Sequence, residues 1–150
     1  MYSELLKILN GYYKTCRYQG VVCTSRDLVL IQQLADAVRQ TYQNFECWGH
    51  PTLVPAPPLG NYITDYCRLA FQTQRTGLII VEPENWLFQW TRDNQRTFWC
   101  HLGGIFGRYP IIVIAKDVRT TTEHLDCYFN AKPIDGIDAR LWLPNKINHE

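Results

Sequence analysis

The class of fold is indicated most clearly by residues 78–84, Leu78-Ile79-Ile80-Val81-Glu82-Pro83-Glu84. The four apolar residues of this stretch follow one another without alternation, which is typical of a strand that is buried on both faces in a parallel sheet. A second run of this kind, Ile111-Ile112-Val113-Ile114-Ala115, is followed by Lys116 and Asp117. Two such strands joined through a helical segment predict a mostly parallel sheet with helices on both sides.

Hydrophobic periodicity and turn residues extend this pattern to the rest of the chain. We expect Ser3, Ser25 and one of Thr121 and Thr122 to cap helices. The predicted helices cover residues 3–16, 25–42, 61–74, 85–102 and 121–128, and the further strands cover 21–24, 45–48 and 141–143. Residues 51–60 contain four prolines and are expected to be a loop. The alternation of strands and helices predicts right-handed crossovers in a three-layer, Rossmann-like α/β fold.

Length and composition fit one globular domain that covers residues 1–150. A chain of 150 residues can bury a sizeable core, and 46% hydrophobic with 19% charged residues excludes extensive disorder. Five tryptophans and nine tyrosines are more than such a domain needs. Aromatic side chains of this kind often anchor protein–protein contacts, so a protein partner or self-association is expected.

The charges give no sign of a nucleic-acid or membrane partner. The formal net charge is +1, and the lysines and arginines are spread along the chain. The start of the chain lacks the features of a signal peptide, and no apolar run approaches the length of a membrane span. The sequence therefore predicts a cytoplasmic protein.

The order of the predicted elements resembles that of P-loop NTPases over roughly residues 20–145. An apolar strand that ends in Glu82 resembles the Walker B strand, and the strand that ends in Lys116 and Asp117 resembles the next one. The resemblance implies that Glu82 lies at the magnesium-associated position and Glu84 near the water-activating one. Lys116 or Asp117 would then lie near the sensor position.

The chain departs from this family directly after the predicted strand 21–24. A phosphate loop needs a glycine-rich turn with a lysine, and the sequence has Ser25-Arg26-Asp27-Leu28 at that place. Asp27 would repel a phosphate. The resemblance therefore implies a degenerate fold without nucleotide or other cofactor, such as the inactive NTPase-like subunits of bacterial multi-component and defence systems. A generic Rossmann-like domain without this ancestry is the other interpretation.

Two kinds of metal site are open alternatives. Glu82, Glu84 and Asp117 could gather at one sheet edge and support a metal-dependent nuclease or hydrolase, whereas helix capping is the ordinary role of an acid such as Glu84. The second alternative is a zinc site whose four ligands would be Cys47, His50, His124 and Cys127. The six cysteines are otherwise expected to be reduced and mostly buried.

The segment 85–102 is the predicted partner surface. It places Trp86, Phe88, Trp90 and Trp99 on more than one face of the expected helix, although packing on a sheet requires only one apolar face. Burial of all four aromatic residues inside the core is the alternative. The preferred function is that of a non-catalytic protein-interaction subunit.

Overall fold

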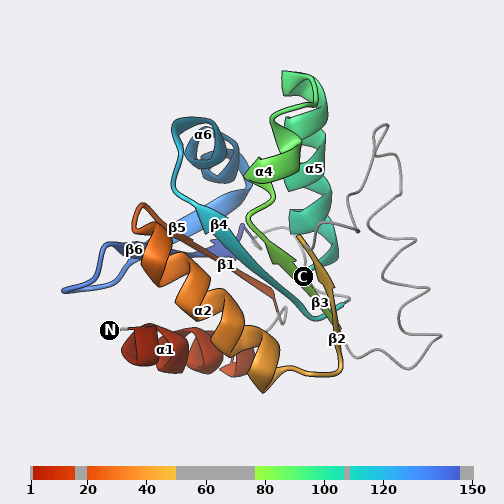
Figure 1. Ribbon diagram of the computed structural model, residues 1–150. Coiled ribbons are helices and arrows are strands. Elements are labelled where there is room, and N and C mark those ends of the chain that lie inside the picture. The colour runs from red at the N-terminus through yellow and green to blue at the C-terminus, as the bar shows by residue number, and fades with distance from the viewer. Residues whose placement is uncertain (1, 16–19, 50–76, 107–108, 146–150) are drawn as a thin grey trace.

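The computed structural model describes residues 2–15, 20–49, 77–106 and 109–145 of the chain. These residues form a sheet of six strands in the order β2-β3-β4-β1-β6-β5, with helices on both of its faces (Figure 1). The elements are α1 (Tyr2–Thr15), β1 (Gly20–Ser25), α2 (Leu28–Thr41), β2 (Phe45–Trp48), β3 (Gly77–Val81), α4 (Glu84–Leu87), α5 (Arg92–Ile105), β4 (Ile111–Lys116), α6 (Arg119–Tyr128), β5 (Phe129–Pro133) and β6 (Ala139–Pro144). The predicted loop 51–60 and helix 61–74 lie outside the described residues.

The sheet is parallel over four strands and antiparallel at one side. β2, β3, β4 and β1 run parallel, and β6 is antiparallel both to β1 and to β5. This confirms the expected helix-flanked and mostly parallel α/β sheet. The predicted strand 141–143 is present within β6, but it runs antiparallel and pairs with β5, a strand that the sequence patterns did not predict.

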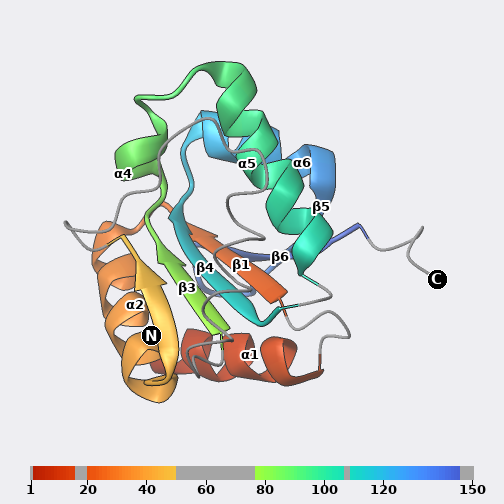
Figure 2. The same cartoon turned by 90° about the vertical axis from the view of Figure 1, so that its right-hand side faces the viewer.

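The two central apolar runs are buried on both faces, as their lack of alternation predicts. Ile111, Val113 and Ala115 of β4 pack into the cluster under α4, α5 and α6. Ile112 and Ile114 pack into the cluster under α1 and α2. Figure 2 shows these two groups of helices on opposite sides of the sheet. No helix in the described part of the chain is long and apolar enough to cross a lipid bilayer.

The predicted single helix over 85–102 is wrong, because the chain forms two helices, α4 and α5, with a break between them. Thr91 is extended, and its hydroxyl accepts a hydrogen bond from the backbone N–H of Asn94 at 3.2 Å, which starts α5 anew. The Trp86 and Trp90 rings lie 5.6 Å apart, and both rings pack against Phe98 of α5. The cap at Thr91 therefore starts a new helix, although the helical spacing of apolar residues continues from residue 85 to residue 102.

The three predicted caps are also wrong. Ser3 lies inside α1, which already begins at Tyr2. Asp27 caps α2, while Ser25 is the last residue of β1. The helix α6 begins after Val118 without a side-chain cap. Thr121 and Thr122 lie inside its first turns and use their hydroxyls for contacts to other segments.

Candidate functional site

The carboxyl ends of β1 and β4 form the switch point of the sheet, where adjacent strands continue to opposite faces. β1 leads into α2 on one face, and β4 leads into α6 on the other (Figure 2). The backbone N–H of Asp117 donates to the Ser25 carbonyl at 3.0 Å and ties the two strand ends together. Ligands of open α/β sheets bind outside the strand ends at such a point. This edge is therefore the candidate functional site.

The N-terminus of α2, which follows β1 at this edge, is capped by a side chain of the chain itself. One carboxylate oxygen of Asp27 accepts hydrogen bonds from the N–H groups of Val29 at 3.1 Å and Leu30 at 3.2 Å. Amides of a helix N-terminus are the donors that would bind a phosphate. The neighbouring Arg26 donates two hydrogen bonds of 3.2 Å to the carboxylate of Asp138. Both the donors and the nearby cation are thus engaged by carboxylates of the chain.

We expect ATP and GTP to give no binding heat in calorimetry with magnesium at micromolar protein and nucleotide concentrations. The reason is that no glycine-rich loop with a lysine follows β1, and that the Asp27 carboxylate also holds the amides at the start of α2. Replacing Asp27 by alanine should lower the free energy of unfolding by about 1 kcal/mol, because α2 loses its cap, and should still create no binding. Magnesium-dependent binding of either nucleotide to the wild-type protein would contradict this expectation.

The three acids of the hydrolase alternative lie at this edge, but each has its own partner. The Oε1 atom of Glu82 lies 3.8 Å from Lys116 Nζ. The hydroxyl of Thr121 donates to Glu84 Oε2 at 2.8 Å, and that of Thr122 donates to Asp117 at 2.5 Å. Among the described residues, no group of three or more His, Cys, Asp or Glu side chains is placed to hold a metal ion. The acids therefore do not form the joint metal site that this alternative requires.

The backbone at Glu82 is strained. Its φ angle is 46°, in the left-handed region that residues other than glycine seldom adopt, and Pro83 follows it. The N–H of Glu82 donates to the carbonyl of Ile114 at 2.6 Å, which holds this conformation at the end of β3. Strain of this kind collects at binding and catalytic sites. The strained residue lies at the same edge of the sheet as the switch point.

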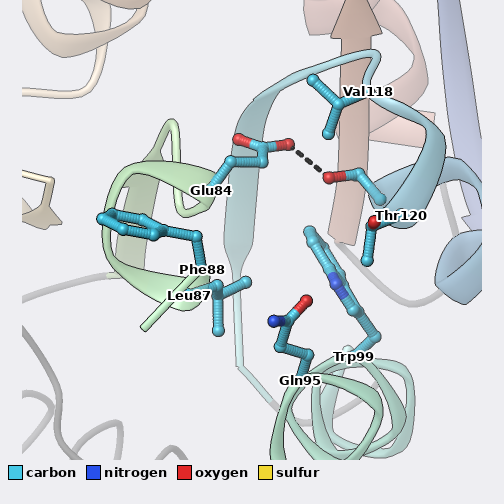
Figure 3. A pocket seen from close by; sticks show the side chains of 8 residues that line it. Glu84, Leu87, Phe88, Gln95, Trp99, Val118 and Thr120 are labelled. Carbon is cyan, nitrogen blue, oxygen red and sulfur yellow. Dashed lines mark hydrogen bonds between the residues drawn. The ribbon is translucent and has the colours of Figure 1, made fainter. Parts of the chain in front are cut away.

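A pocket of about 180 Å³ opens beside Glu84 at this edge, between α4, α5 and α6. Its lining residues are Glu84, Leu87, Phe88, Gln95, Trp99, Val118, Thr120 and Thr121. Figure 3 shows the Glu84 carboxyl at one end and the Gln95 amide at the other, with Leu87 and Phe88 on one side and Trp99 on the opposite side. The pocket thus has polar ends and apolar walls.

Glu84 is the electrostatically unusual group of the pocket. Its Oε1 atom is buried and has no hydrogen-bond partner among the described residues. Burial raises the pKa of Glu84 to about 7, although backbone N–H groups of Glu84 and Lys116, the hydroxyl of Thr121 and the charge of Lys116 act in the other direction. Glu84 does not cap α4, whose N-cap residue is Pro83. The carboxyl group therefore changes its charge near neutral pH at the end of a pocket.

The four aromatic residues of the predicted partner surface differ in their exposure to solvent. Trp86, Trp90 and Trp99 are buried in the core cluster under α4, α5 and α6, with exposures of 4%, 8% and 1%. Phe88 directly follows α4 and is 70% exposed. Only Phe88 of these four presents its ring to solvent.

The predicted zinc ligands are not brought together where the structure describes them. Cys47 packs against the cluster under α1 and α2. His124 and Cys127 belong to α6, which covers the opposite face of the sheet. His50 lies outside the described residues. Among the described ligands, the sheet separates Cys47 from His124 and Cys127.

The expectation of mostly buried cysteines holds for Cys23 but is wrong for two others. Cys23 is buried in β1, where the loss of solvent raises the pKa of its thiol to about 12. Cys100 and Cys127 are exposed on α5 and α6. The helical pattern places them on outward faces, which composition alone does not reveal.

Sequence patterns missed Gln95, Val118 and Thr121 as pocket residues. They belong to separate segments and meet only because α5 and α6 pack side by side on one face of the sheet. The one usable signal was the polar run Thr120-Thr121-Thr122 directly after the expected strand end at Asp117.

A scan against protein-family models, a search of curated proteins and a search of solved structures find no match to this chain.

Proposed function

We propose that the chain is a cytoplasmic, non-catalytic protein-interaction subunit that binds its partner at the carboxyl ends of the parallel strands. The observation that carries this proposal is the 70% exposed ring of Phe88 at the rim of the pocket. An exposed aromatic side chain beside a cavity has the form of an interface anchor. The subunit would act within a multi-component assembly of the bacterial defence type.

Further exposed apolar side chains at the same end of the sheet support this proposal. Leu28 and Val29 in the first turn of α2 are 54% and 64% exposed, and Val118 before α6 is 41% exposed. All of them follow the carboxyl ends of parallel strands, as Phe88 does. Large apolar residues gathered at one end of a domain are typical of an interaction surface.

The fold is proposed to be a Rossmann-like, P-loop NTPase-like fold that has lost its phosphate loop. The arrangement that supports this is β4 between β1 and β3, with Glu82 at the end of β3 and Lys116 at the end of β4. Asp27 closes the position where the phosphate loop would lie. Such a scaffold retains a binding edge without nucleotide chemistry.

The test compares Phe88→Ala with the wild-type chain, using Tyr2→Ala as the matched control. Tyr2 is also an exposed aromatic residue, 37% exposed, but it belongs to α1 and does not line the pocket. Affinity-tagged chains would be isolated from the native cell, and the partner that co-purifies would then be titrated against each variant. We expect Phe88→Ala to weaken binding by about 2 kcal/mol or more, roughly 30-fold, with unchanged thermal stability.

Tyr2→Ala should leave both partner binding and thermal stability unchanged. If Phe88→Ala retains the partner and the self-association of the wild-type chain, the interaction proposal is wrong. Light scattering of the purified proteins measures self-association independently of any partner.

A further inference from the structure

A side-chain hydrogen bond joins α4 to α6. The hydroxyl of Thr121 in α6 donates to Oε2 of Glu84, the first residue of α4, at 2.8 Å (Figure 3). The other carboxyl oxygen of Glu84, Oε1, is buried and has no hydrogen-bond partner in the described part of the chain. The carboxyl group of Glu84 is therefore enclosed where the two helices meet.

The charged groups around Glu84 compensate its carboxylate only in part. Lys116 of β4 is the cation that acts on it. The amine of Lys116 donates to Oδ1 of Asn85 at 2.7 Å and lies 3.8 Å from Oε1 of Glu82, so two other side chains compete for it. The remaining side chains that line the pocket from α5 and from the start of α6 carry no charge: Gln95, Trp99, Val118, Thr120 and Thr121. Burial is thus the dominant influence on this carboxyl group.

The enclosed carboxyl group favours its neutral form. Ionisation inside the contact is costly, because the carboxylate lacks the hydration that it has in water. This cost raises the pKa of Glu84 from 4.5 to about 7. A Glu84 side chain that leaves Thr121 and becomes hydrated ionises at its ordinary pKa. Loss of the proton therefore favours separation of the two side chains.

The element that this contact holds in place is short. α4 has four residues, and its N-cap residue, Pro83, makes no side-chain hydrogen bond to the helix. A helix of this length gains little stability from its own hydrogen bonds, so it depends on tertiary contacts. Leu87 of α4 is buried, whereas Phe88 directly after it is 70% exposed. The contact between Glu84 and Thr121 thus bears on the position of the exposed Phe88 ring.

We propose that a proton on Glu84 holds α4 against α6, and that ionisation of Glu84 lets the segment 84–90 open locally while the sheet stays folded. The regulatory part of this inference rests on the proposed function, because the segment carries Phe88, the proposed anchor for a partner. Opening of the segment displaces this anchor. The partner surface would then respond to pH.

Amide hydrogen exchange of the isolated wild-type chain at pH 6 and pH 8 tests the proposal. The reporters are the amides of Trp86 and Leu87, which donate to the Pro83 carbonyl, and that of Trp90, which donates to the Leu87 carbonyl. After correction for the intrinsic exchange rate, their opening equilibrium should rise about tenfold from pH 6 to pH 8. This rise follows from the difference between a pKa of 4.5 in the open segment and about 7 in the closed one. An unchanged opening equilibrium overturns the inference.

The amides of β1 show whether the opening is local. β1 is buried along its whole length, so its amides report unfolding of the whole domain. The opening equilibrium of the segment 84–90 should exceed that of β1 by at least roughly tenfold. Equal opening equilibria would mean that the segment opens only with the whole domain, and the inference would be wrong.

A variant identifies the group that titrates. In Glu84→Gln the opening equilibrium of the segment should change by less than about twofold between pH 6 and pH 8, because glutamine cannot ionise. The exposed acid control Glu4→Gln should keep the wild-type rise. A rise that persists in Glu84→Gln overturns the inference. Should this variant fail to fold, the carboxyl carbon shift of Glu84 in the wild type decides the question by NMR, because a midpoint near pH 4.5 instead of about 7 excludes the proposed role.

The regulatory part has its own test once a partner is in hand. Partner binding should slow exchange in the segment 84–90, because the partner holds Phe88 in place, and unchanged exchange would overturn the regulatory assignment. The measurements on the isolated chain need no partner. They can therefore succeed when Phe88→Ala leaves assembly intact, or fail when it abolishes assembly, so the two proposals fail separately.

Discussion

Replacement of Trp142 by alanine should lower the free energy of unfolding by about 3 to 5 kcal/mol. Trp142 is 1% exposed, lies on β6 opposite Val22 of β1 and packs into the cluster under α4, α5 and α6. Its indole N–H donates to the Thr24 hydroxyl at 2.8 Å. The substitution leaves a cavity beside the central strand and removes the donor from a buried hydroxyl. Urea denaturation followed by circular dichroism measures the change.

Two variants serve as controls for this experiment. Trp142→Phe should cost less than Trp142→Ala, because most of the ring volume remains and mainly the hydrogen bond to Thr24 is lost. Phe88→Ala should change stability by less than about 0.5 kcal/mol, because its ring is mostly in solvent. A loss below about 1 kcal/mol for Trp142→Ala would show that the indole does not stabilise the sheet.

Glu84→Gln should stabilise the protein by about 3 kcal/mol at pH 8 and by much less at pH 4. Burial raises the pKa of Glu84 from 4.5 to about 7. Between these two values the folded state keeps a proton that the unfolded state has lost. The contribution of Glu84 to the free energy of unfolding is therefore fully present below pH 4.5. The wild type loses it as the pH rises to about 7.

Urea denaturation of the wild type and Glu84→Gln at several pH values between 4 and 8 measures this effect. Glutamine cannot ionise, so the part of the decline that comes from Glu84 should disappear in the variant. Glu4→Gln, at an exposed position on α1, should follow the wild-type curve. Parallel curves for Glu84→Gln and the wild type would mean that Glu84 titrates normally in the folded state.

The central sheet could be predicted from the sequence because its strands are fully buried. The apolar runs 78–81 and 111–115 have no polar face, and this property alone indicates helices on both sides. The strand β5 could not be predicted in this way, because only Phe129 of its residues is buried. An exposed edge strand has no hydrophobic alternation, and its one signal was Gly136, whose φ of 78° marks the turn into β6.

The site could be predicted only to the level of the sheet edge. Glu82, Glu84 and Asp117 follow apolar strands, so their position at the carboxyl ends was readable from the sequence. Which acid is buried depends on how α6 packs over α4, and that is a tertiary contact between Thr121 and Glu84. The burial of Trp86, Trp90 and Trp99 was only one of two interpretations of the aromatic pattern, because periodicity does not show which face of a helix is covered.

The position of β1 between β4 and β6 has a consequence for synthesis on the ribosome. β1 is buried along its whole length, yet both neighbours come late in the chain, and the contact between Thr24 and Trp142 joins residues 118 positions apart. At about 5 to 20 residues per second, β1 is translated on the order of ten seconds before β6 exists. During this time an apolar strand with two open edges is exposed in the nascent chain. We therefore expect residues 20–25 to be the segment that a chaperone has to shield until translation reaches β6.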